Sequence, residues 1–158
     1  FATAGGAEKC AMARAAGADH VIDYHAGDWV TAVLDLTGGQ GVHCVYDSVG
    51  RDTFMGALEV LAPMGMAINY GTASGPVPAF PLQMLHAKSL IVTRPTLRTW
   101  IASRADLDAA AERLFREWRR GALPLEVGRT WPLSAVRDAH AALEARETTG
   151  SLALIPDG

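Results

Sequence analysis

Apolar residues in the first half of the chain follow two alternating patterns. Short apolar runs typical of buried strands alternate with segments whose apolar side chains recur at helical spacing, and glycine or proline stands at several boundaries. The pattern predicts strands at 1–4, 20–24, 42–47 and 66–70, and helices at 7–16, 28–36 and 52–61. Asp28 and Asp52 are the expected N-caps of the last two helices. This alternation predicts an α/β fold with a doubly wound parallel sheet.

The second half of the chain is less regular. A loop rich in glycine and proline at 73–81 precedes the remaining expected elements. These are a helical turn at 82–86, a strand at 90–94, an amphipathic helix at 103–120, an extended segment at 125–131, a helix from a Ser134 cap to about Arg146, and a strand at 151–155.

A doubly wound, Rossmann-like nucleotide-binding sheet begins with a strand, a glycine-rich turn and a helix, and the turn carries the sequence G-x-G-x-x-G. The chain contains no such sequence, and its glycine-rich stretch at 38–41 follows a helix, as a plain helix-to-strand turn does. The opening run FATAGG therefore predicts that the chain starts in the second strand of the sheet, so that the fold is truncated at its N-terminus.

Composition narrows the class of protein. The 158 residues are enough for one domain, and a net charge of −3 gives no reason to expect nucleic acid or an anionic membrane as a partner. No apolar run approaches the roughly 20 residues that span a bilayer. Cys10 and Cys44, both in apolar settings, are interpreted as reduced core thiols of a cytoplasmic protein.

The ends of the expected strands carry the candidate chemistry. The first strand ends at Gly5 without the carboxylate that commonly binds the ribose of NAD, and Lys9 follows one helical turn later. Tyr24 ends the next strand and offers a hydroxyl at the same edge of the sheet. The alternatives are a solvated helix charge for Lys9 and a strand-end cap for Tyr24.

Two further strand ends could hold ligand, because open α/β sheets bind ligands at the carboxyl ends of their strands. The candidates are Ser48–Gly50 and Tyr70–Ala73, and the alternative is an ordinary turn of small residues in each case. Asp47 could act as a general base, but we favour a structural role in which it accepts N–H bonds from the following turn.

Metal and hydrolase chemistry are poorly supported. None of the five histidines is paired with another histidine or a cysteine at the i, i+4 spacing of a helical metal site, so no metal ligand is named. The chain also lacks the G-x-S-x-G sequence of a serine hydrolase.

Several segments resemble a known family. GGAEKCAMARAAGADHVIDY, LTGGQGVHCVYDSVGRDTF, NYGTASGPV, LIVTRPTL and AHAALEARETTGSLALIP occur in this order. They resemble the C-terminal part of quinone oxidoreductases of the zeta-crystallin type, in the medium-chain dehydrogenase/reductase superfamily. The resemblance implies a Rossmann-like cofactor domain, NADPH as hydride donor, no zinc, and quinones or other α,β-unsaturated carbonyl compounds as acceptors.

The resemblance also implies roles for residues. Gly5, Lys9 and Tyr24 match contacts of the 2′-phosphate of NADPH, and Arg146 matches a further contact more loosely. Ser48 is expected near the adenosine half of the cofactor, and Tyr70, Gly71 and Thr72 near its nicotinamide half. No catalytic residue is named, because the proton donor would come from an absent N-terminal domain or from water.

The expected organisation is a dinucleotide-binding fragment over residues 1–158, inactive alone, in which 122–158 returns toward the absent catalytic domain. The resemblance further implies a homodimer formed through the strand Leu90–Arg94. Two other functions stay open: an enoyl-thioester reductase of the same superfamily, and a binding or structural protein without turnover, as in a lens crystallin.

Overall fold

The computed structural model of the chain describes residues 1–123, 127–145 and 147–157. Clustering of close residues divides the chain into two compact units, Phe1–Thr99 and Trp100–Gly158. No helix in the part of the chain that the structure describes is both long and apolar enough to cross a membrane.

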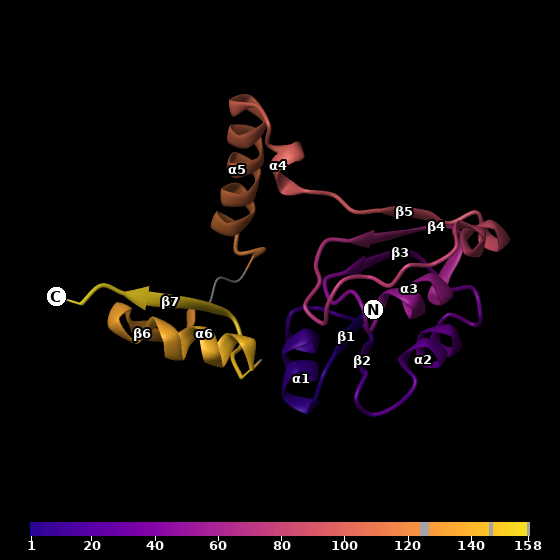
Figure 1. Ribbon diagram of the computed structural model, residues 1–158, viewed down its shortest axis with the longest axis horizontal. Helices are drawn as coiled ribbons and strands as arrows, with labels where there is room; N and C mark the ends of the chain where they lie inside the picture. Colours follow the sequence, from indigo (N-terminus) through magenta and orange to yellow (C-terminus); the bar gives the residue numbers. More distant parts are fainter. Residues whose placement is uncertain (124–126, 146, 158) are drawn as a thin grey trace. The chain divides into compact units, whose positions relative to one another are not determined.

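The first unit alternates strands and helices, as predicted (Figure 1). Its elements are β1 (Ala2–Ala4), α1 (Ala7–Ala15), β2 (Val21–Asp23), α2 (Trp29–Leu36), β3 (Val42–Asp47), α3 (Phe54–Val60), β4 (Leu61–Asn69), the 3-10 helix η1 (Leu82–Lys88) and β5 (Ile91–Thr93). The short helix α4 (Leu97–Trp100) begins in this unit and ends at the first residue of the second. Strand β1 pairs with β2, and β3, β4 and β5 pair in that order; every pair is parallel. The predicted α/β fold with parallel strands is confirmed.

The core of this unit lies where α3 packs on β4. Phe54 and Leu58 of α3 are buried together with Leu61 and Ala67 of β4, and the ring of Phe80 lies 5.7 Å from that of Phe54. Burial of one such large side chain contributes about 1.5–3 kcal/mol. The apolar spacing in FMGALEVL therefore fixes α3 against the sheet, which in turn holds the loops at the carboxyl ends of β3 and β4.

Helix caps test the sequence predictions most directly. Asp28 caps α2 as predicted, because its carboxylate accepts the N–H groups of Val30 (3.0 Å) and Thr31 (3.3 Å). The predicted Asp52 cap of α3 is wrong: the helix begins at Phe54 without a side-chain cap, and the Asp52 carboxylate binds Arg51 Nε at 2.9 Å.

Two further expectations in this unit are corrected. Strand β4 begins at Leu61 and not at residue 66, because its pairing with β3 continues past an irregularity that includes Met64 at φ +61°. Cys10 is buried, but Cys44 is exposed on β3 and is not a core thiol. The neighbouring Tyr46 is 71% exposed, so this part of β3 is uncovered although its sequence is that of a buried strand.

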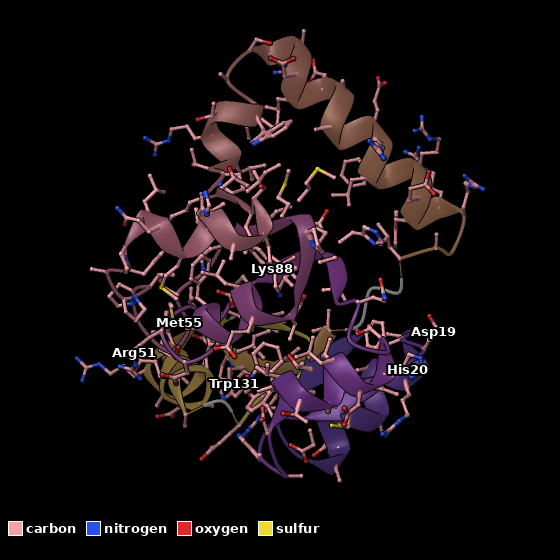
Figure 2. The ribbon with its side chains drawn as sticks, turned by 90° about the vertical axis from the view of Figure 1, so that its right-hand side faces the viewer. Asp19, His20, Arg51, Met55, Lys88 and Trp131 are labelled. Atoms are coloured by element: carbon pink, nitrogen blue, oxygen red, sulfur yellow. The ribbon has the colours of Figure 1, made fainter. Side chains whose placement is uncertain are left out.

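The second unit contains α5 (Arg104–Arg119), β6 (Val127–Pro132), the 3-10 turn η2 (Leu133–Ala135), α6 (Val136–Glu144) and β7 (Ser151–Ile155). Strands β6 and β7 are parallel and pack Trp131, labelled in Figure 2, against α6. Ser103 caps α5, but the predicted Ser134 cap of the last helix is wrong. The N–H and hydroxyl of Ser134 instead donate to the Asp157 carboxylate at 2.9 and 3.2 Å.

Candidate functional site

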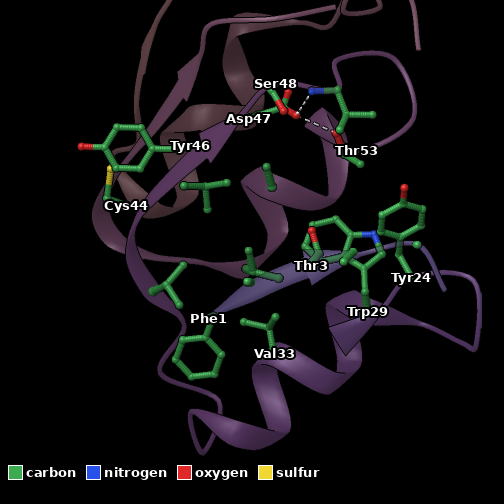
Figure 3. Close-up of a pocket in the computed structure, with 18 of the residues that line it drawn as sticks. Phe1, Thr3, Tyr24, Trp29, Val33, Cys44, Tyr46, Asp47, Ser48 and Thr53 are labelled. Atoms are coloured by element: carbon green, nitrogen blue, oxygen red, sulfur yellow. Dashed lines mark hydrogen bonds between the residues drawn. The ribbon is translucent and has the colours of Figure 1, made fainter. Parts of the chain in front are cut away.

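A cavity of about 650 Å³ lies between β1 and β3 in the first unit. Its walls include residues 1–5, which contain β1, and every residue of β3 except His43, and α2 contributes Trp29 and Val33 (Figure 3). Gly5, Lys9, Tyr24, Ser48 and Tyr70 all line this cavity, so the structure brings together candidate residues from four different strand ends.

Gly5 lies beneath two aromatic side chains at the end of β1. A Cβ atom added at Gly5 would stand 2.8 Å from Tyr24 Oη and 2.7 Å from His25 Cε1, so glycine is the residue that leaves room for both. The Tyr24 and His25 rings meet edge to face, with centroids 4.7 Å apart. The sequence prediction of a cluster at this strand end included Lys9 and Tyr24 but missed His25.

Asp23 is a second residue that the prediction missed. Its Oδ1 atom accepts the backbone N–H of Gly6 at 3.1 Å and that of His25 at 2.9 Å. The bond from Gly6, followed by the bond from His25, holds the pKa of Asp23 below its ordinary value. The carboxylate therefore joins the start of α1 to the turn after β2. The sequence signal was an aspartate two residues before the turn histidine, a spacing typical of an Asx-turn.

Asp47 joins the loops at the carboxyl ends of β3 and β4. It is buried, and its carboxylate accepts hydrogen bonds from Val49 N at 3.0 Å, Gly50 N at 3.2 Å, Thr53 Oγ1 at 2.7 Å and Asn69 Nδ2 at 2.9 Å. Figure 3 labels Asp47 and Thr53 and marks the bond between them. The predicted hydrogen bonds from the following turn are confirmed. A carboxylate with four donors is suited to positioning these loops and poorly suited to taking a proton from a substrate.

The loops after β3 and β4 are held directly against each other. Ala73 N donates to Ser48 O at 3.2 Å, and Ser74 N donates to Val49 O at 2.8 Å. A Cβ added at Gly71 would lie 2.4 Å from the Ser48 carbonyl oxygen, so only glycine permits this approach. Ser48 and the Tyr70–Thr72 stretch, which the sequence placed at two separate strand ends, therefore form one surface.

Beneath these loops, a hydrogen-bonded chain crosses three strands. Asn69, the last residue of β4, is buried between Asp47 and Arg94, and Arg94 Nη1 donates to Asn69 Oδ1. Asn69 and Arg94 were not predicted from the sequence, because neither has a neighbour along the chain that reveals the contact. Arg146, the remaining predicted contact, lies outside the described residues.

Comparison with known proteins shows the family to which this arrangement belongs. Residues 1–116 match the zinc-binding dehydrogenase family, and the chain belongs to it. The quinone oxidoreductase of Pseudomonas aeruginosa is 42% identical over 150 residues, which cover 94% of this chain and 46% of that protein. The 2-haloacrylate reductase of a Burkholderia species is 38% identical over 153 residues, which cover 94% of this chain and 45% of that protein.

Solved structures agree with this assignment. The crystal structure of Escherichia coli quinone oxidoreductase complexed with NADPH matches with a TM-score of 0.92 at 41% identity, over 98% of this chain and 48% of that chain. The chain thus spans about half the length of the relatives it matches. The resemblance to quinone oxidoreductases that was predicted from the sequence is confirmed.

The family description names zinc, but the described residues do not fit a zinc site. Within residues 1–123, 127–145 and 147–157, no group of three or more His, Cys, Asp or Glu side chains could hold a metal ion. Structural zinc takes four such ligands and catalytic zinc three.

Proposed function

We propose that the full-length protein containing this chain is an NADPH-dependent oxidoreductase that reduces quinones or other α,β-unsaturated carbonyl compounds. One observation carries the proposal: Lys9 and Tyr24 line one cavity at a glycine strand end where β1 offers no carboxylate. The likeness to the E. coli quinone oxidoreductase in complex with NADPH supports the same cofactor.

In this proposal the residues of the chain bind and orient the cofactor. Gly5 leaves room for the Tyr24 hydroxyl, and Lys9 and Tyr24 donate charge-assisted hydrogen bonds to the 2′-phosphate that together contribute roughly 1.5–3 kcal/mol at this partly exposed site. The cofactor itself supplies the hydride. The joined loops of Ser48 and Tyr70–Thr72 would keep the rest of the cofactor in position, because their mutual backbone bonds leave them little freedom to move.

We also propose that a β-α unit preceding β1 in the full-length protein completes the site. Strand β1 pairs with β2 and β3 pairs with β4, and no other strand among the described residues pairs with the edges that face the cavity. A parallel strand between β1 and β3 would satisfy both edges and occupy the part of the cavity that lies between them. The cofactor would then bind at the carboxyl ends of the strands, and the glycine-rich turn and helix N-terminus of the added unit would bind the pyrophosphate. The coding sequence upstream of Phe1 tests this, and a stretch without a strand, glycine-rich turn and helix would contradict it.

The activity is tested by following oxidation of NADPH or NADH at 340 nm, with the purified full-length protein and 1,4-benzoquinone as acceptor. We expect turnover with NADPH and a preference for NADPH over NADH of tens- to hundredfold, from roughly 1.5–3 kcal/mol of differential binding. Equal use of NADH would contradict the cofactor assignment. Absence of turnover with tight NADPH binding would favour the binding or structural alternative.

A second acceptor class has its own support. The Burkholderia relative is, by its name, a reductase of 2-haloacrylate, which is an α,β-unsaturated carboxylate. The same assay with 2-chloroacrylate and with an enoyl thioester compares these acceptors with quinone. The largest kcat/KM identifies the acceptor class, and a value for either compound above that for quinone would exclude quinone as the preferred acceptor.

A further inference from the structure

His25 is the least explained side chain of the candidate site. Its backbone N–H donates to Asp23 Oδ1 at 2.9 Å, which fixes the turn that follows β2. Its imidazole consequently lies over Gly5, where an added Cβ would stand 3.0 Å from Nε2. The hydrogen bond to Asp23 and the close packing on Gly5 together hold the ring beside the Tyr24 hydroxyl.

We propose that His25 is a third contact for the 2′-phosphate of NADPH and that its protonation makes the preference for this phosphate dependent on pH. Tyr24 Oη and His25 Nε2 converge on the same point above Gly5, at 2.8 and 3.0 Å from the position of its absent Cβ. A phosphate oxygen that accepts from Tyr24 is therefore within reach of the imidazole as well. The inference rests on the proposed function, because it assumes that this cluster binds the phosphate.

Two titratable residues precede His25 in the chain and contact it. The Asp23 carboxylate of β2 accepts the backbone N–H of His25, and the Tyr24 ring meets the imidazole edge to face. Lys9 of α1 lines the same cavity as Tyr24. Asp23 stays ionised near neutrality because its N–H bonds lower its pKa. Imidazole is the side chain that ordinarily gains a proton as the pH falls from about 8 to about 5, and the protonated ring donates from both nitrogens.

The 2′-phosphate also changes its charge over this pH range, so the experiment must separate the effect of the phosphate from that of His25. A phosphate monoester has a second pKa of about 6, so it loses negative charge as the pH falls and binds cations less strongly. Protonation of His25 acts in the opposite direction. The effect of His25 is therefore the difference between the wild-type protein and a His25 variant at each pH, in which the change of the phosphate cancels.

The experiment measures binding without turnover. Calorimetry with the full-length protein compares 2′,5′-ADP with 5′-ADP, which lacks the 2′-phosphate, from about pH 5.5 to about pH 8.5. Four proteins are measured: wild type, His25→Gln, His25→Arg, and the control His86→Gln, which makes the same change at an exposed position on η1. The readout is the ratio of the two dissociation constants, which reports the contribution of the phosphate.

At about pH 5.5 we expect the ratio of the wild-type protein to exceed that of His25→Gln by about three- to tenfold, and at about pH 8.5 we expect the two to converge. His25→Arg should keep the high ratio at all pH values, and His86→Gln should follow the wild type. A wild-type ratio that parallels the His25→Gln ratio at every pH would overturn the role of His25 while leaving the proposed function intact. Equal binding of 2′,5′-ADP and 5′-ADP by all four proteins would overturn the proposed function itself.

Discussion

Gly5→Ala is the substitution whose effect follows most directly from the geometry. The added methyl carbon would stand 2.8 Å from Tyr24 Oη and 2.7 Å from His25 Cε1, both shorter than van der Waals contact. The backbone of Gly5 lies outside the left-handed region, so alanine can adopt it without strain. The two side chains must therefore move while the strand stays in place.

The magnitude follows from what moves. Displacing Tyr24 would remove the hydrogen bond that we propose it donates to the 2′-phosphate. This bond would be worth roughly 1.5 kcal/mol, the lower end for a charged partner, because the tyrosine is partly exposed. We expect the dissociation constant of NADPH to rise by about tenfold and that of NADH by less than about threefold. The free energy of unfolding should change by less than about 1 kcal/mol.

The matched control is Gly27→Ala, in the turn after β2, where an added Cβ would have no atom within 4 Å. Fluorescence titration of both cofactors with the full-length protein measures the effect, and urea denaturation measures stability. Gly27→Ala should leave both cofactors unaffected. The reasoning is refuted if Gly5→Ala weakens NADPH and NADH equally, or if it leaves the binding of NADPH unchanged.

Three further predictions follow from the same structure. Lys9→Ala in the full-length protein should raise the KM for NADPH by about tenfold and leave that for NADH nearly unchanged, measured by initial rates, and equal effects on both would contradict a phosphate contact. Lys88, labelled in Figure 2, donates from Nζ to the carbonyl oxygens of Glu59 and Leu61, each at 2.8 Å, so Lys88→Met should lower the free energy of unfolding by about 1–3 kcal/mol in urea denaturation. A loss below about 0.5 kcal/mol would mean that water replaces both bonds. Strand β5 pairs with β4, and no other described strand pairs with its outer edge, so we predict a two-fold dimer in which β5 pairs with the β5 strand of a second copy. Ile91→Lys should then give a monomer in light scattering, and a monomeric wild type would contradict the dimer.

Local sequence patterns predicted the presence of the helices and strands better than the residues at which they begin and end. Strands β3 and β7 match their predicted ranges because each short apolar run is bounded by turn residues. The cap of α3 was wrong because the Asp52 carboxylate binds Arg51 and the Asp52 backbone N–H donates to the hydroxyl of Ser74, 22 residues away along the chain. Lys88 likewise binds carbonyl groups 27 and 29 residues away. Hydrophobic spacing carries no information about such distant contacts.

The candidate site was predictable to a similar extent. Gly5, Lys9 and Tyr24 could be found because strand ends at one edge of a parallel sheet converge, and the structure places all three on one cavity. The sequence did not reveal His25, Asn69 and Arg94, because their contacts depend on which residues come together when the chain folds. Whether the three predicted residues bind the phosphate stays a prediction.

The acidic residues near the cavity change the interpretation of cofactor choice. The sequence argument rested on the absence of a carboxylate at the end of β1, yet Asp23 lies one strand away and Asp47 lines the cavity. Each of these carboxylates accepts backbone N–H groups, Asp23 from Gly6 and His25 and Asp47 from the turn after β3. A carboxylate bound in this way has its charge partly balanced by the donors and its free lone pairs reduced, so it is a poorer acceptor for a ribose hydroxyl. Preference for a phosphorylated ribose therefore depends on where each acidic side chain finds its hydrogen-bond donors, and not only on how many acidic residues the strand ends contain.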